Sequence, residues 1–234
     1  SGLELLDPTA REVAGFLKRV RTAGHTPQSA RPLFVWHTNI APGRPAPRNI
    51  VIQFHALGAD RAIADAVLIR LTRSFVGEIS KEEPVLRVNS MGDKETRARL
   101  ARELTHYMRR RGTSLPADCI ACAKNDIFAA AEILTKNNDR EGMPSSTDHL
   151  SENSRKHFES VLEYLESTDT PYELAPDLMS RGGTWGETCF EVTGGERVHA
   201  WGSRYLDLSR SFFKNPSSSV GAVIRISLEP TKKK

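Results

Sequence analysis

One arginine lies where it could bind an anion. Arg181 is followed by two glycines, and residues 184–192, TWGETCFEV, then read as a β-strand. A glycine turn lets the backbone approach a ligand closely, and the guanidinium group offers a rigid fork of N–H donors to a carboxylate or phosphate. The other interpretation is a solvated surface arginine, the usual place of a lone charge. These residues alone leave both interpretations open.

Two of the three cysteines, Cys119 and Cys122, have the CxxC spacing of half a zinc or redox site. A structural zinc site needs two further thiolate or imidazole ligands. The sequence has no second CxxC and no closely spaced pair of histidines. We therefore expect no metal site, and we interpret these residues as paired structural thiols. The low, odd number of cysteines, with Cys189 as the third, favours a reducing compartment, and we expect a cytoplasmic protein.

The composition is typical of a globular chain. The 234 residues are 38% hydrophobic and 26% charged, enough for one large domain or two small ones. No run approaches the roughly eighteen apolar residues of a membrane span, and no signal-peptide pattern is present, so no membrane partner is expected. The formal net charge of +4, part of it in a basic tail at 231–234, permits contact with nucleic acid without requiring it.

The elements that would position these residues begin with a helix at 8–23, which has an apolar stripe along one face. Strands are expected at 31–37 and 49–57, and the loop rich in proline and glycine between them suggests an antiparallel pair. A helix at 61–78 follows. Its inward face is expected to carry Ile63, Ala66, Val67, Leu71 and Phe75.

A strand at 84–89 leads into a helix that Asp93 can cap and that runs to about residue 111. One face of this helix is apolar and the other is basic. The basic residues are Lys94, Arg97, Arg99, Arg102, Arg109, Arg110 and Arg111. Such a face could contact RNA phosphates, but Glu95 and Glu103 interrupt it and no aromatic residues are interleaved for base stacking. We therefore favour a solvated face.

The second half of the chain alternates helices with short strands. Helices are expected at 124–136 and 151–166, and a short strand at 171–174. The strand after Arg181 forms a hairpin with residues 197–201 through the Gly194-Gly195 turn. A short helix near 202–208 and a buried strand at 220–228 complete the chain. The order of elements predicts an α+β fold, with a mostly antiparallel sheet flanked by helices in one domain over residues 3–230 and a helical insertion at about 80–150.

Several segments, taken in order, resemble the catalytic domain of histidyl-tRNA synthetase, a class II aminoacyl-tRNA synthetase. Residues 53–60, QFHALGAD, are similar to the family's Gln-Phe-His-Gln-Leu-Gly-x-Glu strand, and residues 202–205, GSRY, are similar to its Gly-Gly-Arg-Tyr. The Arg181 turn and the TCFE strand resemble the family's histidine-binding loop and the strand after it. The first helix, with residues 24–27, looks like the motif that supplies the class II dimer interface.

The resemblance implies a site. In the family, the positions matched by Asp60, Arg181 and Tyr205 line the amino-acid pocket, and Arg181 would be the catalytic arginine if the protein is active. An ammonium group would then bind Asp60 and a carboxylate would bind Arg181.

The departures from the family pattern are as informative as the matches. The strand at 34–39 lacks the arginine that holds the ATP α-phosphate, and Ala56 replaces an expected glutamine. The loop tyrosines are missing, with Thr184 and Trp185 nearby. The position of the arginine that clamps ATP falls at Leu228, with Arg225 three residues earlier. No anticodon-binding domain is expected after residue 230.

We therefore expect a non-catalytic, homodimeric paralogue of histidyl-tRNA synthetase that acts as a ligand-binding or regulatory module. Known paralogues include the regulatory subunit of ATP phosphoribosyltransferase and a regulatory domain of a kinase that senses uncharged tRNA. The expected partners are a histidine-like amino acid and either tRNA or a partner enzyme. One alternative is an aminoacyl-adenylating enzyme using ATP and Mg²⁺, in which Arg44, Arg48 or Arg225 replaces the lost arginines. The other is a tRNA-binding protein that uses the basic helix.

Overall fold

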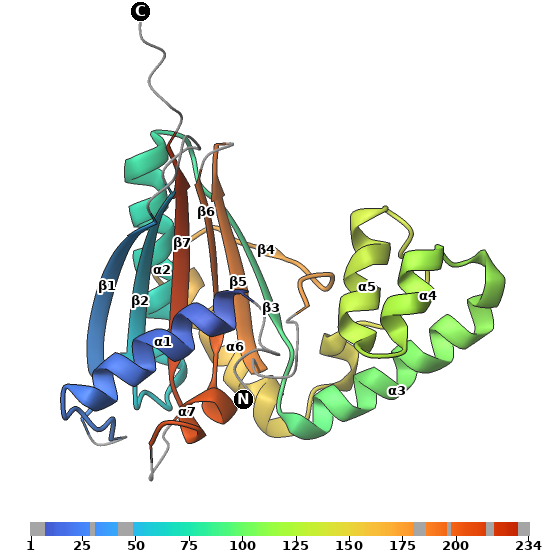
Figure 1. Cartoon of the computed structure of the whole chain (residues 1–234), viewed down its shortest axis with the longest axis horizontal. Helices are drawn as coiled ribbons and strands as arrows, with labels where there is room; N and C mark the ends of the chain where they lie inside the picture. The colour runs from blue at the N-terminus through green and yellow to red at the C-terminus, as the bar shows by residue number, and fades with distance from the viewer. Residues whose placement is uncertain are drawn as a thin grey trace, which may run out of the picture.

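A seven-stranded sheet forms the centre of the protein, in the order β1-β2-β7-β6-β5-β3-β4 (Figure 1). The structure is a computed structural model, and it describes residues 8–28, 31–41, 49–179, 186–195, 198–213 and 218–228. The strands are β1 (Leu33–Ala41), β2 (Asn49–Leu57), β3 (Val85–Ser90), β4 (Glu173–Leu174), β5 (Gly186–Gly194), β6 (Val198–Arg204) and β7 (Val220–Ser227). All neighbouring strands are antiparallel except β3 and β4, which are parallel. The predicted α+β fold and the predicted hairpin are confirmed.

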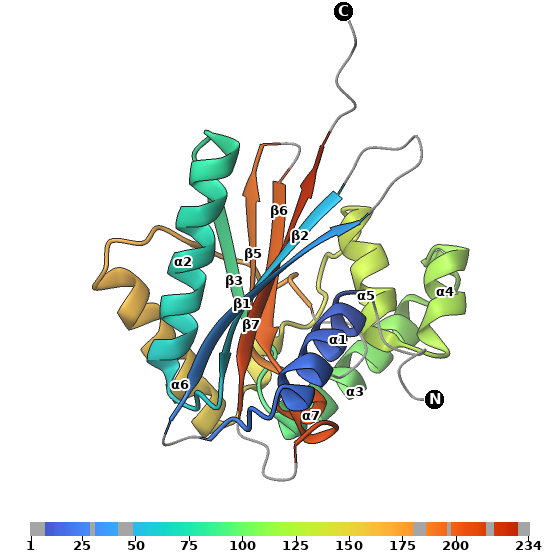
Figure 2. The same ribbon diagram turned by 60° about the vertical axis from the view of Figure 1, so that its left-hand side comes forward.

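Helices cover both faces of the sheet (Figures 1 and 2). Helices α2 (Ala62–Ser80) and α6 (Glu152–Glu166) pack on one face, and α1 (Pro8–Thr22) packs on the other beside the short α7 (Leu206–Arg210). Successive residues of each strand point to opposite faces of the sheet, so alternate residues pack under α2 and α6 or under α1. On β7, for example, Ala222 and Ile224 belong to the core under α2, whereas Val223 belongs to the core under α1.

A helical lobe with its own core lies beside β3 (Figure 1). It contains α3 (Lys94–Arg111), α4 (Ala117–Ala123) and α5 (Ile127–Lys136), with 3₁₀ turns at Gly112–Ser114 and Ser146–His149. Asp93 caps α3 as predicted, because its carboxylate accepts a hydrogen bond from the Thr96 N–H at 2.8 Å. Helix α4 was not predicted from the sequence, and it carries Cys119 and Cys122, both free thiols. Within the described residues, no helix is both long and apolar enough to span a bilayer.

The apolar stripe of helix α1 is buried inside the protein. Val13, Phe16, Leu17 and Val20 are all buried against the strands below. The helix is therefore placed as predicted. However, the apolar face from which we expected a dimer interface already packs on the helix's own sheet.

Helix α2 is rotated relative to the prediction. Ile63, Val67 and Leu71 were expected to face inward, but they are 45%, 47% and 46% exposed. The buried side chains are instead Asp65, Leu68, Ile69, Thr72 and Val76, together with three alanines. The predicted inward face is therefore wrong for its three largest aliphatic residues. The reason is that Asp65 faces the interior, where it forms an ion pair with Arg204 that is described below.

The packing at the centre of the sheet generates a stability prediction. A Cβ added at Gly202 of β6 would lie 2.2 Å from Cζ of Phe190 and 2.7 Å from the Gly221 carbonyl oxygen. We expect Gly202→Ala to lower the free energy of unfolding by about 1–3 kcal/mol through overpacking, measured by urea denaturation. The matched control is Gly15→Ala in α1, where the nearest atom is 3.8 Å away, and the gain in helix propensity should stabilise the protein by up to about 1 kcal/mol. Equal effects at the two positions would contradict this packing.

Candidate functional site

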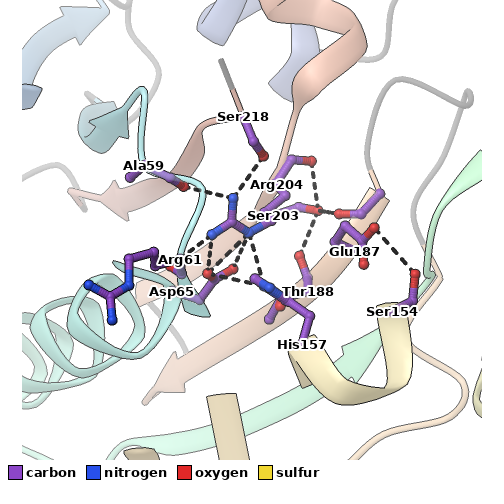
Figure 3. Close-up of polar contacts among 11 residues, drawn as sticks. Ala59, Arg61, Asp65, Ser154, His157, Glu187, Thr188, Ser203, Arg204 and Ser218 are labelled. Atoms are coloured by element: carbon purple, nitrogen blue, oxygen red, sulfur yellow. Dashed lines mark hydrogen bonds and ion pairs between the residues drawn. The ribbon is translucent and has the colours of Figure 1, made fainter. Parts of the chain in front are cut away.

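A buried ion pair organises one end of the sheet (Figure 3). Arg204, the last residue of β6, is only 3% exposed, and its partner Asp65 on α2 is fully buried. Nε of Arg204 lies 2.9 Å and 3.1 Å from the two carboxylate oxygens of Asp65, and Nη2 donates to the same carboxylate. Such forked, charge-assisted contacts are among the strongest hydrogen bonds in proteins.

The remaining donors of Arg204 bind the chain around it. Nη1 donates to the Ala59 carbonyl oxygen at 2.8 Å and to Oγ of Ser218 at 2.7 Å, and Nη2 donates to the Arg61 carbonyl oxygen at 3.1 Å. The guanidinium group therefore joins the end of β6, the start of α2 and the segment before β7. A buried charge is tolerated only when it is paired and its donors are satisfied in this way.

A histidine from α6 completes the cluster. Nε2 of His157 lies 3.1 Å from Nε of Arg204 and 3.4 Å from a carboxylate oxygen of Asp65. Burial alone would raise the pKa of Asp65, but the charge of Arg204 and hydrogen bonds from His157 and Arg204 lower it. Asp65 is therefore ionised at neutral pH, and the three side chains hold β6, α2 and α6 together.

A cavity of about 470 Å³ lies against this cluster. Arg204 and His157 form part of its wall. Four carboxylates also line it, those of Asp60, Asp93, Glu187 and Asp207, together with three further cations, Lys94, Arg97 and Arg210. A cavity with both signs of charge is suited to a small ligand that carries both signs itself, because each end can meet an opposite charge.

Glu187 is the most unusual residue of the cavity wall. It follows Gly186 at an irregularity in the β5–β6 register and has a φ of +53°, which is rare for a residue with a side chain. Its Oε1 accepts a hydrogen bond from Ser154 at 3.3 Å, but its Oε2 is buried and has no hydrogen-bond partner within the described residues. Burial raises the pKa of Glu187, and the negative charge of Asp93 adds to this effect, while His157 and Ser154 oppose it. The wall thus holds a carboxyl group with an unused acceptor.

The structure places one of the three predicted site residues, Asp60, at the cavity. Asp60 lines the cavity, and its carboxylate accepts a hydrogen bond from the Ser218 N–H at 3.0 Å. Arg181 lies outside the described residues. The segment that carries it leads into Gly186, however, and Gly186 lines the same cavity.

Tyr205 lies elsewhere. It is fully buried in the core under α1 and does not belong to the residues that line this cavity. Its hydroxyl group is 2.7 Å from Nδ1 of His55, and Nε2 of His55 is 3.1 Å from Oε1 of Gln53. Phe16 of α1 stacks on the His55 ring with 4.1 Å between centroids. The side chain therefore packs on the opposite face of the sheet from Arg204.

The protonation state of His55, which contacts Tyr205 and Gln53, follows from its burial. Burial, and then the charge of His37, lowers the pKa of His55 to about 3, so its ring is neutral at pH 7. A neutral imidazole has one donor and one acceptor. Because Oε1 of Gln53 can only accept, Nε2 of His55 donates to it, and Nδ1 accepts from the Tyr205 hydroxyl. Tyr205 acts here as a donor in a closed, buried network.

The cations suggested as replacements for the missing arginines were Arg44, Arg48 and Arg225. The first two lie outside the described residues, as do Thr184 and Trp185. Arg225 is held on the α1 side of the sheet, where its Nη2 donates to Glu12 at 2.8 Å and to Thr9 at 2.9 Å. Arg225 is therefore committed to α1 and is directed away from the cavity. In the part of the chain that the structure describes, no group of three or more His, Cys, Asp or Glu side chains is arranged to hold a metal ion.

Sequence reasoning missed Asp65, His157, Glu187 and Arg204 as site residues. A signal for the ion pair was present. Arg204 continues the alternation of Val198, Ala200 and Gly202, all of which are buried, and Asp65 shares the buried face of α2. Two opposite charges on two buried faces predict an ion pair, because an unpaired buried charge is too costly.

The ion pair generates the second prediction. Arg204→Lys keeps the charge but loses the fork, so we expect the free energy of unfolding at pH 7 to fall by about 3–5 kcal/mol. Folding lowers the pKa of Asp65. The ionised carboxylate therefore stabilises the fold at pH values above the ordinary pKa of an aspartate, and this stabilisation is lost as the pH falls through the lowered pKa. The difference in free energy of unfolding between the wild type and the variant should therefore become smaller at acidic pH.

The control for this experiment is Arg210→Lys. Arg210 is exposed and pairs with Asp207 at 2.9 Å, and exposed pairs contribute at most about 1 kcal/mol. Denaturant unfolding across pH 3 to 8 measures both variants. A loss for Arg204→Lys no larger than that for Arg210→Lys would show that the buried pair does not hold the fold.

Comparison with known proteins finds relatives in sequence and in structure. No family model matches the chain. A histidine–tRNA ligase from Fervidobacterium nodosum is 30% identical over 162 residues, which is 65% of this chain and 38% of the relative. The chain thus spans about two fifths of the length of such relatives.

Solved structures agree in fold. Apo histidyl-tRNA synthetase from S. aureus aligns with a TM-score of 0.66 at 20% identity, over 94% of this chain and 54% of that one. A Bacillus halodurans protein described as an ATP phosphoribosyltransferase regulatory subunit/histidyl-tRNA synthetase aligns with a TM-score of 0.55 at 21% identity, over 93% and 60%. The chain has the class II catalytic fold, and its similarity to these relatives supports a catalytic core like that of histidyl-tRNA synthetase.

Proposed function

We propose that this chain binds a small zwitterionic amino acid, histidine or a relative of it, in the cavity at Asp60 without activating it. It would then act as a binding or regulatory module. The observation that carries the proposal is that Asp60 and Gly186, which follows directly on the Arg181 segment, line one cavity.

The chemistry of the cavity supports a zwitterion. An ammonium group needs anionic acceptors, and Asp60 and Glu187 provide two on the wall. A carboxylate group needs a cation, and Arg181 offers a fork of donors from the segment that ends at Gly186. Arg204, which is tied to Asp65 and to backbone carbonyl oxygens, keeps this end of the sheet rigid and so prepares the cavity for its ligand.

The missing arginines argue against activation. Adenylation brings a carboxylate to the α-phosphate of ATP, and it depends on positive charge placed there in advance. The β1 sequence LFVWHTNIA has no arginine, and Arg225 pairs with Glu12 on the α1 side. Each lost contact typically costs on the order of 3 kcal/mol in transition-state stabilisation, or about a hundredfold in rate.

The regulatory part of the proposal rests on structural similarity to a solved protein. The Bacillus halodurans neighbour is described both as a synthetase and as a regulatory subunit of ATP phosphoribosyltransferase, so this fold is associated with both roles. We propose that the present chain transmits ligand occupancy to a partner enzyme. The start of α2 is well placed for this, because Asp60 precedes it and Asp65 holds Arg204.

A second candidate function, contact with tRNA, is favoured by one observation. On α3, Arg102, Arg109 and Arg110 are exposed, and within the described residues they form no ion pair. Unpaired cations along one helix are available to phosphates. An ATP- and Mg²⁺-dependent ligase is the third candidate, with Arg44 or Arg48 supplying the lost charge.

Isothermal titration calorimetry tests the binding proposal. We expect histidine to bind, and Asp60→Asn and Arg181→Ala each to weaken binding by about tenfold to a hundredfold, since each removes a charge-assisted contact. Histamine, which lacks the carboxylate, should bind the wild type more weakly than histidine does and should be insensitive to Arg181→Ala. The same titrations with ATP and with tRNA examine the other candidates.

The matched control is Asp148→Asn, which removes an exposed aspartate from the 3₁₀ turn at Ser146–His149 and should leave histidine binding unchanged. If histidine fails to bind at millimolar concentration, or binds equally well to all three variants, the cavity does not hold an amino acid in the proposed way.

A further inference from the structure

Glu187 is held in a backbone conformation that a residue with a side chain rarely adopts. Its φ is +53°, in the left-handed region that favours glycine. Two backbone hydrogen bonds fix it there. The Glu187 N–H donates to the Gly92 carbonyl oxygen at 2.9 Å, and the Met91 N–H donates to the Glu187 carbonyl oxygen at 2.8 Å. Backbone strain that the surrounding chain enforces in this way is typical of ligand-binding positions.

The strained turn places the Glu187 side chain in the wall of the cavity. Oε1 accepts a hydrogen bond from Oγ of Ser154 on α6 at 3.3 Å (Figure 3). Oε2 is buried and has no hydrogen-bond partner among the residues that the structure describes. A buried carboxylate oxygen without a donor is destabilising, and native proteins rarely keep one. A ligand that brings a donor to Oε2 would satisfy it.

Most cations of the cavity are neutralised by acidic residues of the chain itself. Arg97 and Arg210 both pair with Asp207, at 3.5 Å and 2.9 Å. The fork of Arg204 is occupied by a buried carboxylate on α2. Lys94 is exposed, so water solvates its ammonium group. The described wall therefore holds no buried cation that needs an anion from the ligand.

The acidic groups of the cavity differ in what is left for a ligand. Asp93 is occupied by the chain, since its carboxylate accepts hydrogen bonds from the Thr96 N–H at 2.8 Å and from the Ser151 hydroxyl at 2.7 Å. Asp60 is the acceptor that the proposed function assigns to the ammonium group of an amino acid. Glu187 then remains as a second acceptor, with one buried oxygen unused.

We propose that Glu187 binds a cationic group in the side chain of the ligand, so that the cavity selects amino acids with a basic side chain. This inference rests on the proposed function, in which Asp60 and Arg181 bind the main-chain ammonium and carboxylate groups. Arginine, lysine and protonated histidine belong to the selected class. The cavity, at about 470 Å³, lies within the range of roughly 300–1,000 Å³ that is typical of small-molecule sites, so a side chain longer than an imidazole has room.

The electrostatics around Glu187 favour a cation over a neutral group. Burial raises the pKa of this carboxyl, and the charge of Asp93 adds to the effect, whereas His157, Ser154 and Arg204 oppose it. A ligand cation at Oε2 would offset the loss of solvation and stabilise the ionised carboxylate. A neutral side chain of the same shape would offer at most a weaker hydrogen bond.

Isothermal titration calorimetry with arginine and citrulline at neutral pH tests the proposal. Citrulline has the length and shape of arginine but carries a neutral urea group. The wild type should bind arginine about tenfold to a hundredfold more tightly than citrulline, because only arginine forms an ion pair with Glu187. Glu187→Gln keeps the size and removes the charge, so the ratio should fall to about threefold or less.

Two further variants serve as controls. Glu159→Gln makes the same chemical change at an exposed position of α6 that does not line the cavity, and it should keep the wild-type ratio. Glu187→Gly should also lose the preference for arginine. Because glycine adopts a positive φ without strain, this variant should melt at or above the temperature of the wild type, so its loss of selectivity cannot be ascribed to unfolding.

The outcomes separate this inference from the proposed function. Suppose that amino acids bind and depend on Asp60 and Arg181, but the ratio of arginine to citrulline affinity is the same in the wild type and in Glu187→Gln. The role of Glu187 would then be overturned, and the proposed function would stand. If no amino acid binds the wild type at millimolar concentration, both are overturned.

Discussion

The Arg204–Asp65 ion pair is the contact on which the other features of this protein depend. Desolvating two charges is costly, and the cost is met only because the guanidinium group finds a carboxylate, three further oxygen acceptors and a neighbouring imidazole. To bury Asp65, α2 must turn that residue toward the sheet. The same rotation directs Ile63, Val67 and Leu71 outward. One buried carboxylate thus holds Arg204 at the cavity wall and leaves three aliphatic side chains of α2 exposed.

The sequence predicted the elements better than it predicted their orientation. Periodicity located α1, α3, α6 and the β5–β6 hairpin, because each carries its own apolar stripe, cap or turn. The rotation of α2 could not be obtained in this way, because the side chain that decides it, Arg204, lies 139 residues further along the chain. Hydrophobic spacing alone favoured Ile63, Val67 and Leu71, which have the larger aliphatic side chains. A long-range ion pair outweighed that local preference.

The candidate site was predictable only in part, for a related reason. Asp60 follows β2 by three residues and lines the cavity, as expected of a residue in a turn after a strand. Tyr205 and Arg204 are adjacent, however, and neighbouring residues at the end of a strand face opposite sides. Arg204 faces the cavity, and Tyr205 packs under α1 with His55. Resemblance to a family identified the segment, but the alternation of the strand decides which of its residues reaches the cavity. Glu187 has no sequence signal, because its exposure to the cavity follows from a local irregularity of β5.

We propose that the cavity binds an amino acid but does not activate it, because β1 has no arginine for the α-phosphate and Arg225 is paired with Glu12. ATP–pyrophosphate exchange tests this claim most directly, run with Mg²⁺ and each of the twenty amino acids on protein already shown to bind histidine. For every amino acid, exchange should be no faster than the background without protein. Clear exchange with any of them, abolished by Arg181→Ala, would contradict it and would show that the chain is an active ligase core.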